Sequence, residues 1–412
     1  MRVTGVIAEF NPFHNGHRYL LQKAREITDA ELVIVVLSGA FVQRGAPALL
    51  SKYARAKTAL LCGADLVVEL PVFASCASAQ YFAEGALRLL CDLGADSFVF
   101  GSEIGDLAPL LSLCELLCTE PVEYKHVLRT SLTSGNSFPA ARRQAVASLM
   151  PEAASLLDAP NNLLGLAYLS ARQKRGYSIK PYTILRQGAN YHEKELLKEF
   201  SSATALRAFL EGNPATLSPL FPFLPASAYQ ILEEEFSHQT FVTERDLSVP
   251  LALKLLQCKT AEELQCFADM SPALANRIFK NRYQEISFPE FSIYLKTKEL
   301  TLTRISRALL HLILDITSQD QKEFCTLAHS PYARILGFRP AARTFFRERK
   351  TDKENFVPLI LKPARGEKLL SPQAYYFFQK DIVCAELYRQ ISFQKSGVAC
   401  KSEFTHEILF VE

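Results

Sequence analysis

The segment Phe10-Asn11-Pro12-Phe13-His14-Asn15-Gly16-His17 places two histidines three residues apart, with a glycine between them. Imidazole N–H groups can stabilise negative charge that develops on the phosphate oxygens of a nucleotide. The glycine lets the backbone come close to a ligand. Two histidines near a turn can also be ordinary core or surface groups, but the spacing, the glycine and the preceding Asn-Pro pair together favour a phosphate-binding site.

The elements around this motif would position it for that role. Residues 3–9 form an apolar run typical of a buried strand, and residues 18–24 have helical periodicity. The histidines would therefore lie at a strand-to-helix turn. A helix N-terminus offers free backbone N–H groups and a partial positive charge, which suit an anionic ligand.

Two further segments supply cations and hydroxyl groups. In Gln43-Arg44-Gly45-Ala46-Pro47, the guanidinium of Arg44 could clamp a phosphate or carboxylate, and Lys52 just beyond it could act as a point charge. In Ser202-Ala203-Thr204, the hydroxyls and Arg207 one turn later could hold the outer phosphates of a triphosphate. The alternatives are a solvated loop for the first segment and simple helix capping for the second.

Amide side chains and a third arginine complete the polar candidates. Asn161 and Asn162 could read a base or a ribose, or could simply cap a helix. Arg186 and Gln187 end a predicted strand, from which they could reach the same crevice. The chain has neither a Gly-x-x-x-x-Gly-Lys-Ser/Thr loop nor a Gly-x-Gly-x-x-Gly turn after its first strand, so a bound nucleotide would have to use the histidine turn.

Short apolar strands alternate with helices through the first half of the chain. This alternation predicts an α/β fold with a Rossmann-like parallel sheet covered on both faces. In such sheets ligands bind beyond the carboxyl ends of the strands, where His14, His17 and Gly101 would fall. The predicted strands are residues 3–9, 31–37, 65–70, 97–100 and 180–186, with helices at 51–62 and 77–90.

The chain of 412 residues has a formal net charge of +3 and is 49% hydrophobic, so a large core is expected and nucleic-acid binding would need local basic clusters. We predict a catalytic domain at 1–213 and a mainly helical region at 214–412, divided near the proline-rich stretch 218–225.

The 10 cysteines form no Cys-x-x-Cys pair. Cys114 and Cys118 would share a helix face. Their spacing allows metal binding, but a role as small buried hydrophobic side chains is favoured.

Cysteine usage and the chain's hydrophobicity indicate a compartment. Scattered cysteines suit a reducing cytosol. No secretory signal pattern is present, and no apolar run reaches the ~18 residues that a membrane-spanning helix needs. We therefore expect a cytoplasmic protein that does not bind a membrane.

Together these residues resemble the nucleotidyltransferase superfamily with the His-x-Gly-His signature, and more narrowly the bacterial tRNA(Met) cytidine acetate ligase family. One departure is Ala203, where many superfamily members carry serine. The resemblance spans most of the chain and is carried by residues 5–17, 38–47, 51–55, 63–71, 100–103, 180–182, 303–307 and 332–337.

The resemblance implies that acetate attacks the α-phosphate of ATP to give acetyl-adenylate and pyrophosphate. The acetyl group then passes to N4 of the wobble cytidine of elongator tRNA(Met). Mg²⁺ is expected to accompany ATP, without a carboxylate cage of its own. The catalytic residues expected are His14, His17, Arg44 and Lys52. The ATP-binding residues expected are Ile7, Ala8, Glu9, Phe10, Asn11, Pro12, Phe13, His14, Asn15, Gly16, His17, Arg18, Tyr19, Leu20, Gly101, Asn161, Asn162, Arg186, Gln187, Ser202, Thr204 and Arg207.

Two segments, 276–283 and 337–350, interleave arginine with aromatic residues, as an RNA-binding surface would. Arginines can meet phosphates, and exposed aromatic rings can stack on unpaired bases. The alternative is that the aromatics belong to the core and the arginines to a solvated helix face. The tRNA-binding residues expected are Arg277, Lys280, Arg282, Arg304, Arg307, Arg339, Arg343 and Arg347.

Two other functions fit parts of this pattern. A small-molecule adenylyltransferase would transfer AMP to a phosphorylated metabolite and bind no RNA, but it would not need the long helical region. A non-catalytic RNA-binding protein could keep the nucleotidyltransferase scaffold, but it would have no reason to keep both histidines. A test for acetate-dependent and ATP-dependent labelling of tRNA separates the three.

Overall fold

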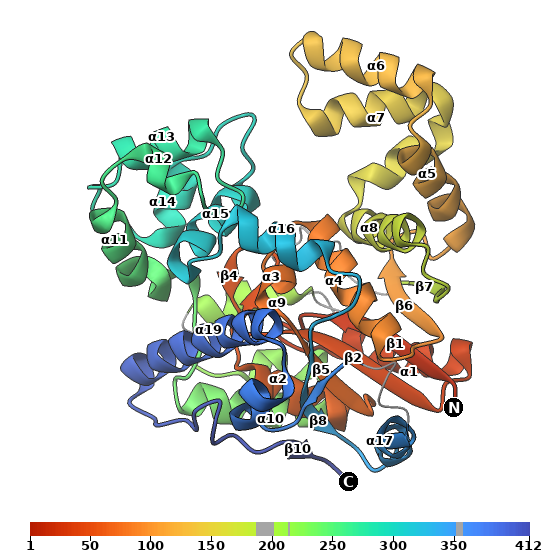
Figure 1. Ribbon diagram of the computed structural model, residues 1–412, viewed down its shortest axis with the longest axis vertical. Helices are drawn as coiled ribbons and strands as arrows, with labels where there is room; N and C mark the ends of the chain where they lie inside the picture. The colour runs from red at the N-terminus through yellow and green to blue at the C-terminus, as the bar shows by residue number, and fades with distance from the viewer. Residues whose placement is uncertain (187–201, 213–214, 352–356) are drawn as a thin grey trace.

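The computed structural model describes residues 1–186, 202–212, 215–351 and 357–412 and has one central, mostly parallel sheet (Figure 1). The strand order is β10-β8-β5-β2-β1-β6-β7, and β9 pairs with β8. The parallel strands of the first half are β1 (Val3–Ala8), β2 (Leu32–Ser38), β5 (Leu66–Leu70), β6 (Ser97–Ser102) and β7 (Lys180–Leu185). The predicted strands and the α/β class are confirmed.

The central strands are buried on both faces. In β2, Leu32, Ile34 and Val36 belong to one hydrophobic cluster, while Val33, Val35 and Leu37 belong to the other. Both sets are fully buried because helices cover each side of the sheet, as parallel sheets require. This explains why the strand reads as a continuous apolar run rather than an alternating one.

Each face has its own set of helices. The cluster that contains Val33 also takes side chains from α1 (Asn15–Thr28), α2 (Lys52–Leu61), α9 (Ala203–Glu211) and α10 (Ala226–Ser237). The opposite cluster takes side chains from α3 (Val72–Ser75), α4 (Ala79–Asp92), α8 (Pro160–Arg175) and α19 (Pro372–Ser396). The predicted helices at 51–62 and 77–90 correspond to α2 and α4.

Two groups of helices rise above the sheet in Figure 1. One, at the upper right, contains α5 (Leu107–Thr119), α6 (Val122–Thr133) and α7 (Phe138–Leu149). The other, at the upper left, contains α11 (Ser248–Gln257), α12 (Ala261–Leu264), α13 (Pro272–Lys280), α14 (Phe288–Tyr294) and α15 (Leu302–Leu314). In α5, the Sγ atoms of Cys114 and Cys118 lie 3.9 Å apart as free thiols, so they share a face as predicted.

The C-terminal region is mainly helical, as expected, but it also extends the first sheet. Strand β8 (Ala333–Phe338) pairs antiparallel with β5, and β9 (Leu359–Ile360) and β10 (Leu409–Phe410) pair with β8. These strands were not predicted. The division at residue 213 stays a prediction, but the two parts share one sheet and are not joined only by a linker.

The proline-rich stretch does not act as a free linker. Residues Ser218–Phe223 form a 3₁₀ helix, and Leu220 and Leu224 are buried in the cluster shared with α1 and α2. The apolar side chains between the prolines fix this segment against the core. Within the described residues, no helix combines the length and apolar character needed to cross a bilayer.

Candidate functional site

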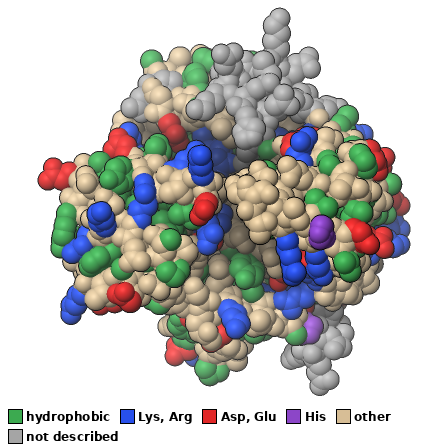
Figure 2. All heavy atoms as spheres, turned by 90° about the horizontal axis from the view of Figure 1, so that it is seen from above, with side chains coloured by type: hydrophobic (Ala, Val, Ile, Leu, Met, Phe, Trp, Pro, Cys, Tyr) green, Lys and Arg blue, Asp and Glu red, His purple; other side chains and the backbone are tan. Residues whose placement is uncertain are grey.

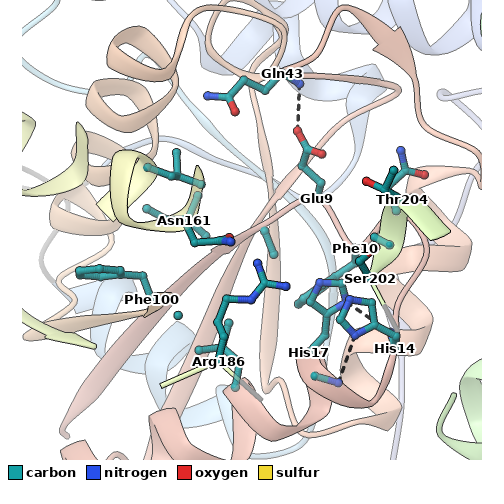
Figure 3. A pocket seen from close by; sticks show the side chains of 18 of the residues that line it. Glu9, Phe10, His14, His17, Gln43, Phe100, Asn161, Arg186, Ser202 and Thr204 are labelled. Carbon is teal, nitrogen blue, oxygen red and sulfur yellow. Dashed lines mark hydrogen bonds between the residues drawn. The ribbon is translucent and has the colours of Figure 1, made fainter. Parts of the chain in front are cut away.

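A cavity of about 570 Å³ opens where β1 ends and α1 begins. Its walls come from the His14 turn, the ends of β6 and β7, the start of α9 and the start of α15. Figure 3 shows Arg186 reaching into the space between Asn161 and the two histidines. Segments far apart in the chain therefore converge at the carboxyl edge of the sheet, where the fold class predicts a ligand.

His14 and His17 form the N-terminal cap of α1. Nδ1 of His14 accepts a hydrogen bond from the backbone N–H of Gly16 at 3.1 Å, and Nδ1 of His17 accepts one from the N–H of His14 at 3.2 Å. This reciprocal pattern satisfies two otherwise unpaired donors of the helix start. Because both Nδ1 atoms accept, a neutral ring at either position carries its proton on Nε2.

The two imidazoles stack with their centroids 3.7 Å apart, and Phe10 and Phe13 pack against His17. Burial, with Arg186 and Arg207 adding to it, lowers the pKa of His14 to about 3. Burial, then His14 and Arg186, lower the pKa of His17 well below its usual value. Both rings are therefore neutral hydrogen-bond donors at physiological pH.

The start of α9 faces this turn. Ser202 caps the helix by accepting from the N–H of Ala205 at 3.1 Å, as predicted. Arg207 is buried, and it donates to the backbone oxygen of Asn11 at 2.6 Å and to Oγ1 of Thr204 at 3.1 Å. The arginine thus ties α9 to the histidine motif and brings positive charge to the cavity wall.

The two asparagines have different positions. Glu103 accepts hydrogen bonds from the N–H groups of Asn161 and Asn162, so its carboxylate caps α8. Asn162 is buried, and its Oδ1 accepts from the N–H of Glu103 at 3.0 Å. Asn161 lines the cavity beside Gly101 and Arg186. Neither asparagine side chain therefore caps α8. Asn161 donates from Nδ2 to Oε1 of Glu103 at 2.6 Å and also lines the cavity, where it can meet a ligand.

Most residues of the predicted ATP site line the cavity. They are Ile7, Ala8, Glu9, Phe10, Asn11, His14, Gly16, His17, Tyr19, Leu20, Gly101, Asn161, Arg186, Ser202, Thr204 and Arg207, together with the predicted catalytic residue Arg44. Pro12, Phe13, Asn15, Arg18 and Asn162 do not line it, and Gln187 lies outside the described residues. The sequence also missed wall residues that carry no polar signal, such as Phe82, Phe100, Leu164 and Tyr168.

Lys52 does not line this cavity, which corrects its predicted position beside the phosphates. Its Nζ lies 2.8 Å from Oε2 of Glu69 and 2.9 Å from Oε2 of Glu403, and the side chain is buried. These carboxylates raise the pKa of Lys52 above its usual range in spite of burial. The lysine is therefore paired within the core and held away from a ligand.

Arg55, which the sequence did not single out, shapes the cavity from behind. Its side chain is fully buried and donates to the backbone oxygens of Glu9 and Ser38, each at 2.8 Å, and to that of Gly39. Glu9 directly follows β1, Ser38 ends β2, and Gly39 begins the loop after β2. The guanidinium thus holds both loops in place. The sequence predicted the helix that carries Arg55 but not these contacts.

The predicted RNA-binding arginines fall in two separate places. Arg277, Lys280 and Arg304 line a surface groove of about 840 Å³ on α13 and α15. Thr303 and Arg307, on the same two turns of α15, line the nucleotide-sized cavity instead. Arg307 is paired with Asp269 at 2.8 Å, and Arg282 stacks on Phe279. Figure 2 shows lysine and arginine side chains around a hollow on the upper face.

Arg343 and Arg347 belong to α17 (Ala342–Thr351), and Arg339 precedes this helix, which Figure 1 shows at the lower edge of the sheet. The antiparallel pairing puts Phe338, the end of β8, beside Leu66, the start of β5. The N–H of Arg339 accordingly donates to the oxygen of Asp65 at 2.8 Å. These arginines do not share one surface with Arg277 and Arg304, which corrects the single cluster suggested by the sequence.

Comparisons with known proteins agree with this geometry. The family model "HIGH Nucleotidyl Transferase" matches residues 1–402. Proteins named tRNA(Met) cytidine acetate ligase are similar over essentially the full length: the one from Acetivibrio thermocellus is 35% identical with 100% of both chains covered, and the one from Thermoanaerobacter pseudethanolicus is 36% identical with 99% of this chain and 100% of its own covered.

The crystal structure of apo Thermotoga maritima TmcAL has a TM-score of 0.91 and 30% identity, with 100% of both chains covered. The same protein bound with alpha-thio ATP has a TM-score of 0.89, with 100% of this chain and 99% of that chain covered. Sequence, fold and cavity therefore lead to the same assignment. This chain belongs to the tRNA(Met) cytidine acetate ligase family of the HIGH nucleotidyltransferases.

Proposed function

We propose that this protein is an ATP-dependent ligase that activates acetate as acetyl-adenylate and transfers the acetyl group to N4 of the wobble cytidine of elongator tRNA(Met). The observation that carries the proposal is the donor-rich end of the cavity. His14 and His17 stack beside Ser202, Thr204 and Arg207, at the N-terminus of α1. Neutral imidazoles, hydroxyls, a guanidinium and helix N–H groups suit a polyphosphate.

In the first step, the acetate oxygen attacks the α-phosphorus and the bond to pyrophosphate breaks. Negative charge moves onto the departing phosphates. Donors from the Nε2 atoms of His14 and His17 stabilise that charge without needing to change their protonation state, because burial keeps both rings neutral. Arg186 and Arg207 add positive charge beside the same phosphates. No protein nucleophile is required.

The helical region favours an RNA acceptor over a small metabolite. The groove of Arg277, Lys280 and Arg304 borders the cavity along α15, since Thr303 lines one hollow and Arg304 the other. The adjacent Tyr294 is exposed and could stack on a base. A small-molecule adenylyltransferase would have no use for this basic surface beside its nucleotide site.

Mg²⁺ would enter with ATP. Among the described residues, no three His, Cys, Asp or Glu side chains gather to hold a metal ion, and Glu9 is the one carboxylate in the described wall of the cavity. Mg²⁺ keeps several waters and commonly binds through substrate phosphates. We therefore assign its ligands mainly to the triphosphate and to water.

The test is to incubate the protein with radiolabelled acetate and ATP, with and without bulk tRNA. We expect acetate-dependent ATP–pyrophosphate exchange without tRNA, and ATP-dependent label in elongator tRNA(Met) when tRNA is added. Exchange that requires a phosphorylated metabolite in place of acetate would favour the adenylyltransferase. ATP binding with no label in any tRNA would contradict the ligase.

The site can be tested in the same assay with His14→Ala and His17→Ala. Each should slow adenylate formation about a hundredfold or more, as the loss of a preorganised donor does. His14→Asn is the matched variant, because asparagine preserves the helix cap but not the imidazole. If His14→Asn retained the wild-type rate, the ring would have only a structural role.

A further inference from the structure

We propose that Glu9 and Gln43 form the acceptor subsite: the Glu9 carboxylate takes the proton from cytidine N4, and the Gln43 side-chain amide donates to the acetyl oxygen. This inference rests on the proposed ligase function and names the residues of its second step. Both side chains line the cavity: Glu9 directly follows β1, and Gln43 lies in the turn between β3 (Phe41–Val42) and β4 (Ala46–Pro47).

Glu9 is distinguished by being alone. In the described wall of the cavity it is the one acidic side chain, among arginines, histidines, hydroxyls and amides. Its Oε1 accepts a hydrogen bond from the backbone N–H of Gln43 at 2.9 Å. Figure 3 shows that bond at the top of the view, away from His14 and His17. The bond fixes the carboxylate while Oε2 remains available to a ligand.

Gln43 contributes a buried donor that the protein itself does not use. Its Nε2 is fully shielded from solvent and has no hydrogen-bond partner among the described residues. An unpaired buried amide is costly, and such groups in a cavity commonly wait for a ligand. The backbone of Gln43 holds Glu9 while its side chain lines the same cavity. One residue thus couples a base to a hydrogen-bond donor.

The position of the pair agrees with the geometry of adenylate formation. The incoming oxygen and the departing pyrophosphate lie roughly in line on opposite sides of the phosphorus. If the outer phosphates lie against the histidines and α9, acetate lies on the far side of the α-phosphate. Glu9 and Gln43 lie away from the histidines in Figure 3, on the side of the cavity where acetate would then bind.

In the second step, cytidine N4 attacks the acetyl carbonyl carbon and a C–N bond forms. The carbonyl electron pair moves to oxygen, where Nε2–H of Gln43 stabilises the oxyanion. Glu9 removes one proton from N4. The intermediate then collapses, the bond between the acetyl carbon and the AMP oxygen breaks, AMP leaves, and Glu9 returns its proton to solvent. Atoms and charge balance without a further reactant.

The same carboxylate would select the base. Glutamate accepts a hydrogen bond from the exocyclic amine of cytosine, whereas uracil presents an acceptor oxygen at that position. A uridine at the wobble position would therefore face Glu9 with two acceptors opposed. Of the two pyrimidines, only cytidine offers both the amine nucleophile and a hydrogen-bond donor to Glu9.

The experiment separates the two half-reactions of the full-length protein. Glu9→Gln retains the shape and the Oε1 acceptor but not the base. We expect acetyl transfer to tRNA(Met) to fall about a hundredfold more than acetate-dependent ATP–pyrophosphate exchange. Gln43→Met, of similar size without the donor, should slow transfer about a hundredfold with Glu9 in place.

Other outcomes would overturn the assignment. Equal loss of exchange and transfer in Glu9→Gln would indicate a role in binding ATP or its Mg²⁺. Retention of the wild-type transfer rate in either variant would remove that residue from the chemistry. Lys57→Gln on α2, exposed and outside the cavity wall, is the control for general effects of a surface substitution on transfer. Failure of the wild-type protein to exchange or to transfer would contradict the ligase function itself, which separates the two failures.

Discussion

Two buried polar regions lie at the same edge of the sheet. They differ in whether hydrogen bonds and ion pairs within the protein occupy their polar groups. In the cavity, the neutral rings of His14 and His17 keep their Nε2–H donors, and one carboxylate shares the described wall with them. Behind it, Lys52 lies between Glu69 and Glu403, each within 3 Å of its ammonium. The first region therefore has more hydrogen-bond donors than acceptors and suits an anionic ligand. In the second region, the ammonium of Lys52 is already paired with two carboxylates.

The comparison shows that burial and charge alone do not identify a binding residue. Lys52 and His14 are both almost fully buried. Burial opposes the ionisation of Glu403, yet Lys52, Arg334 and Tyr53 together hold the pKa of its carboxyl below the usual range. In the cavity, by contrast, the pKa of His14 is lowered and its ring stays neutral. The paired lysine stabilises the fold, and the unprotonated histidine is ready for a ligand.

We expect the largest effect of a single substitution at Lys52. Lys52→Met would leave Glu69 and Glu403 buried without their cation, which should lower the free energy of unfolding by about 3–5 kcal/mol. Urea denaturation measures this loss. Lys57→Met, on the same helix but exposed, is the control and should stay within about 0.5 kcal/mol of the wild type.

A second variant separates structure from binding at this cluster. Adding Glu403→Gln to Lys52→Met removes one of the stranded charges and should recover part of the lost stability. If Lys52→Met instead kept its full stability and lost ATP binding, Lys52 would contact the nucleotide and the comparison would be wrong.

The error over Lys52 shows where sequence reasoning reached its limit. Local pattern placed the lysine correctly, at the start of a helix after the second parallel strand. Its partner Glu403 comes from the C-terminal tail, and no periodicity links positions so far apart. The same holds for Arg55, whose acceptors are backbone carbonyls and leave no signature in the sequence.

The fold divides in the same way. The parallel strands were predictable because continuous apolar runs between helices have a single common explanation. The strand β8 was not, because residues 333–338 lie in a helical stretch and pair with β5 across the chain. That antiparallel pairing also places the arginine segment 337–350 at the edge of the sheet opposite the cavity. The histidine turn was found because its chemistry and its local geometry lie in consecutive residues.

A smaller effect is expected at His14, whose lowered pKa should make the free energy of unfolding depend on pH. The folded pKa of His14 is about 3, against about 6.5 in the unfolded chain, so below pH 6.5 the unfolded state binds a proton that the folded state does not. Stability is full above pH 6.5 and falls as the pH is lowered. Between pH 7 and pH 5 the histidine should cost about 2 kcal/mol.

Denaturation of the wild type and of His14→Asn at both pH values measures this contribution. The difference between pH 7 and pH 5 should be about 2 kcal/mol smaller in the variant. The exposed His126→Gln is the control, and it should retain the wild-type difference. An unchanged pH dependence in His14→Asn would mean that His14 is protonated in the folded protein, and the neutral-donor role would fail.

The smallest effect extends the contrast to the arginines of the C-terminal region. Arg307 is paired with Asp269, whereas Nε of Arg304 is buried without a hydrogen-bond partner among the described residues, in the groove that borders the cavity. Charge reversal at Lys280 and Arg304 should weaken tRNA binding about tenfold and flatten its dependence on salt. Filter binding over a range of salt concentrations measures both quantities.

The matched pair for this prediction is charge reversal at Arg343 and Arg347. These exposed arginines belong to α17, which follows β8 in the chain. Because β8 runs antiparallel to β5, α17 lies at the edge of the sheet opposite the cavity. Their reversal changes the net charge by the same amount but should alter tRNA binding much less. A larger loss from the α17 pair would mean that the tRNA body wraps around the sheet. Proximity to the cavity would then be a poor guide to the RNA surface.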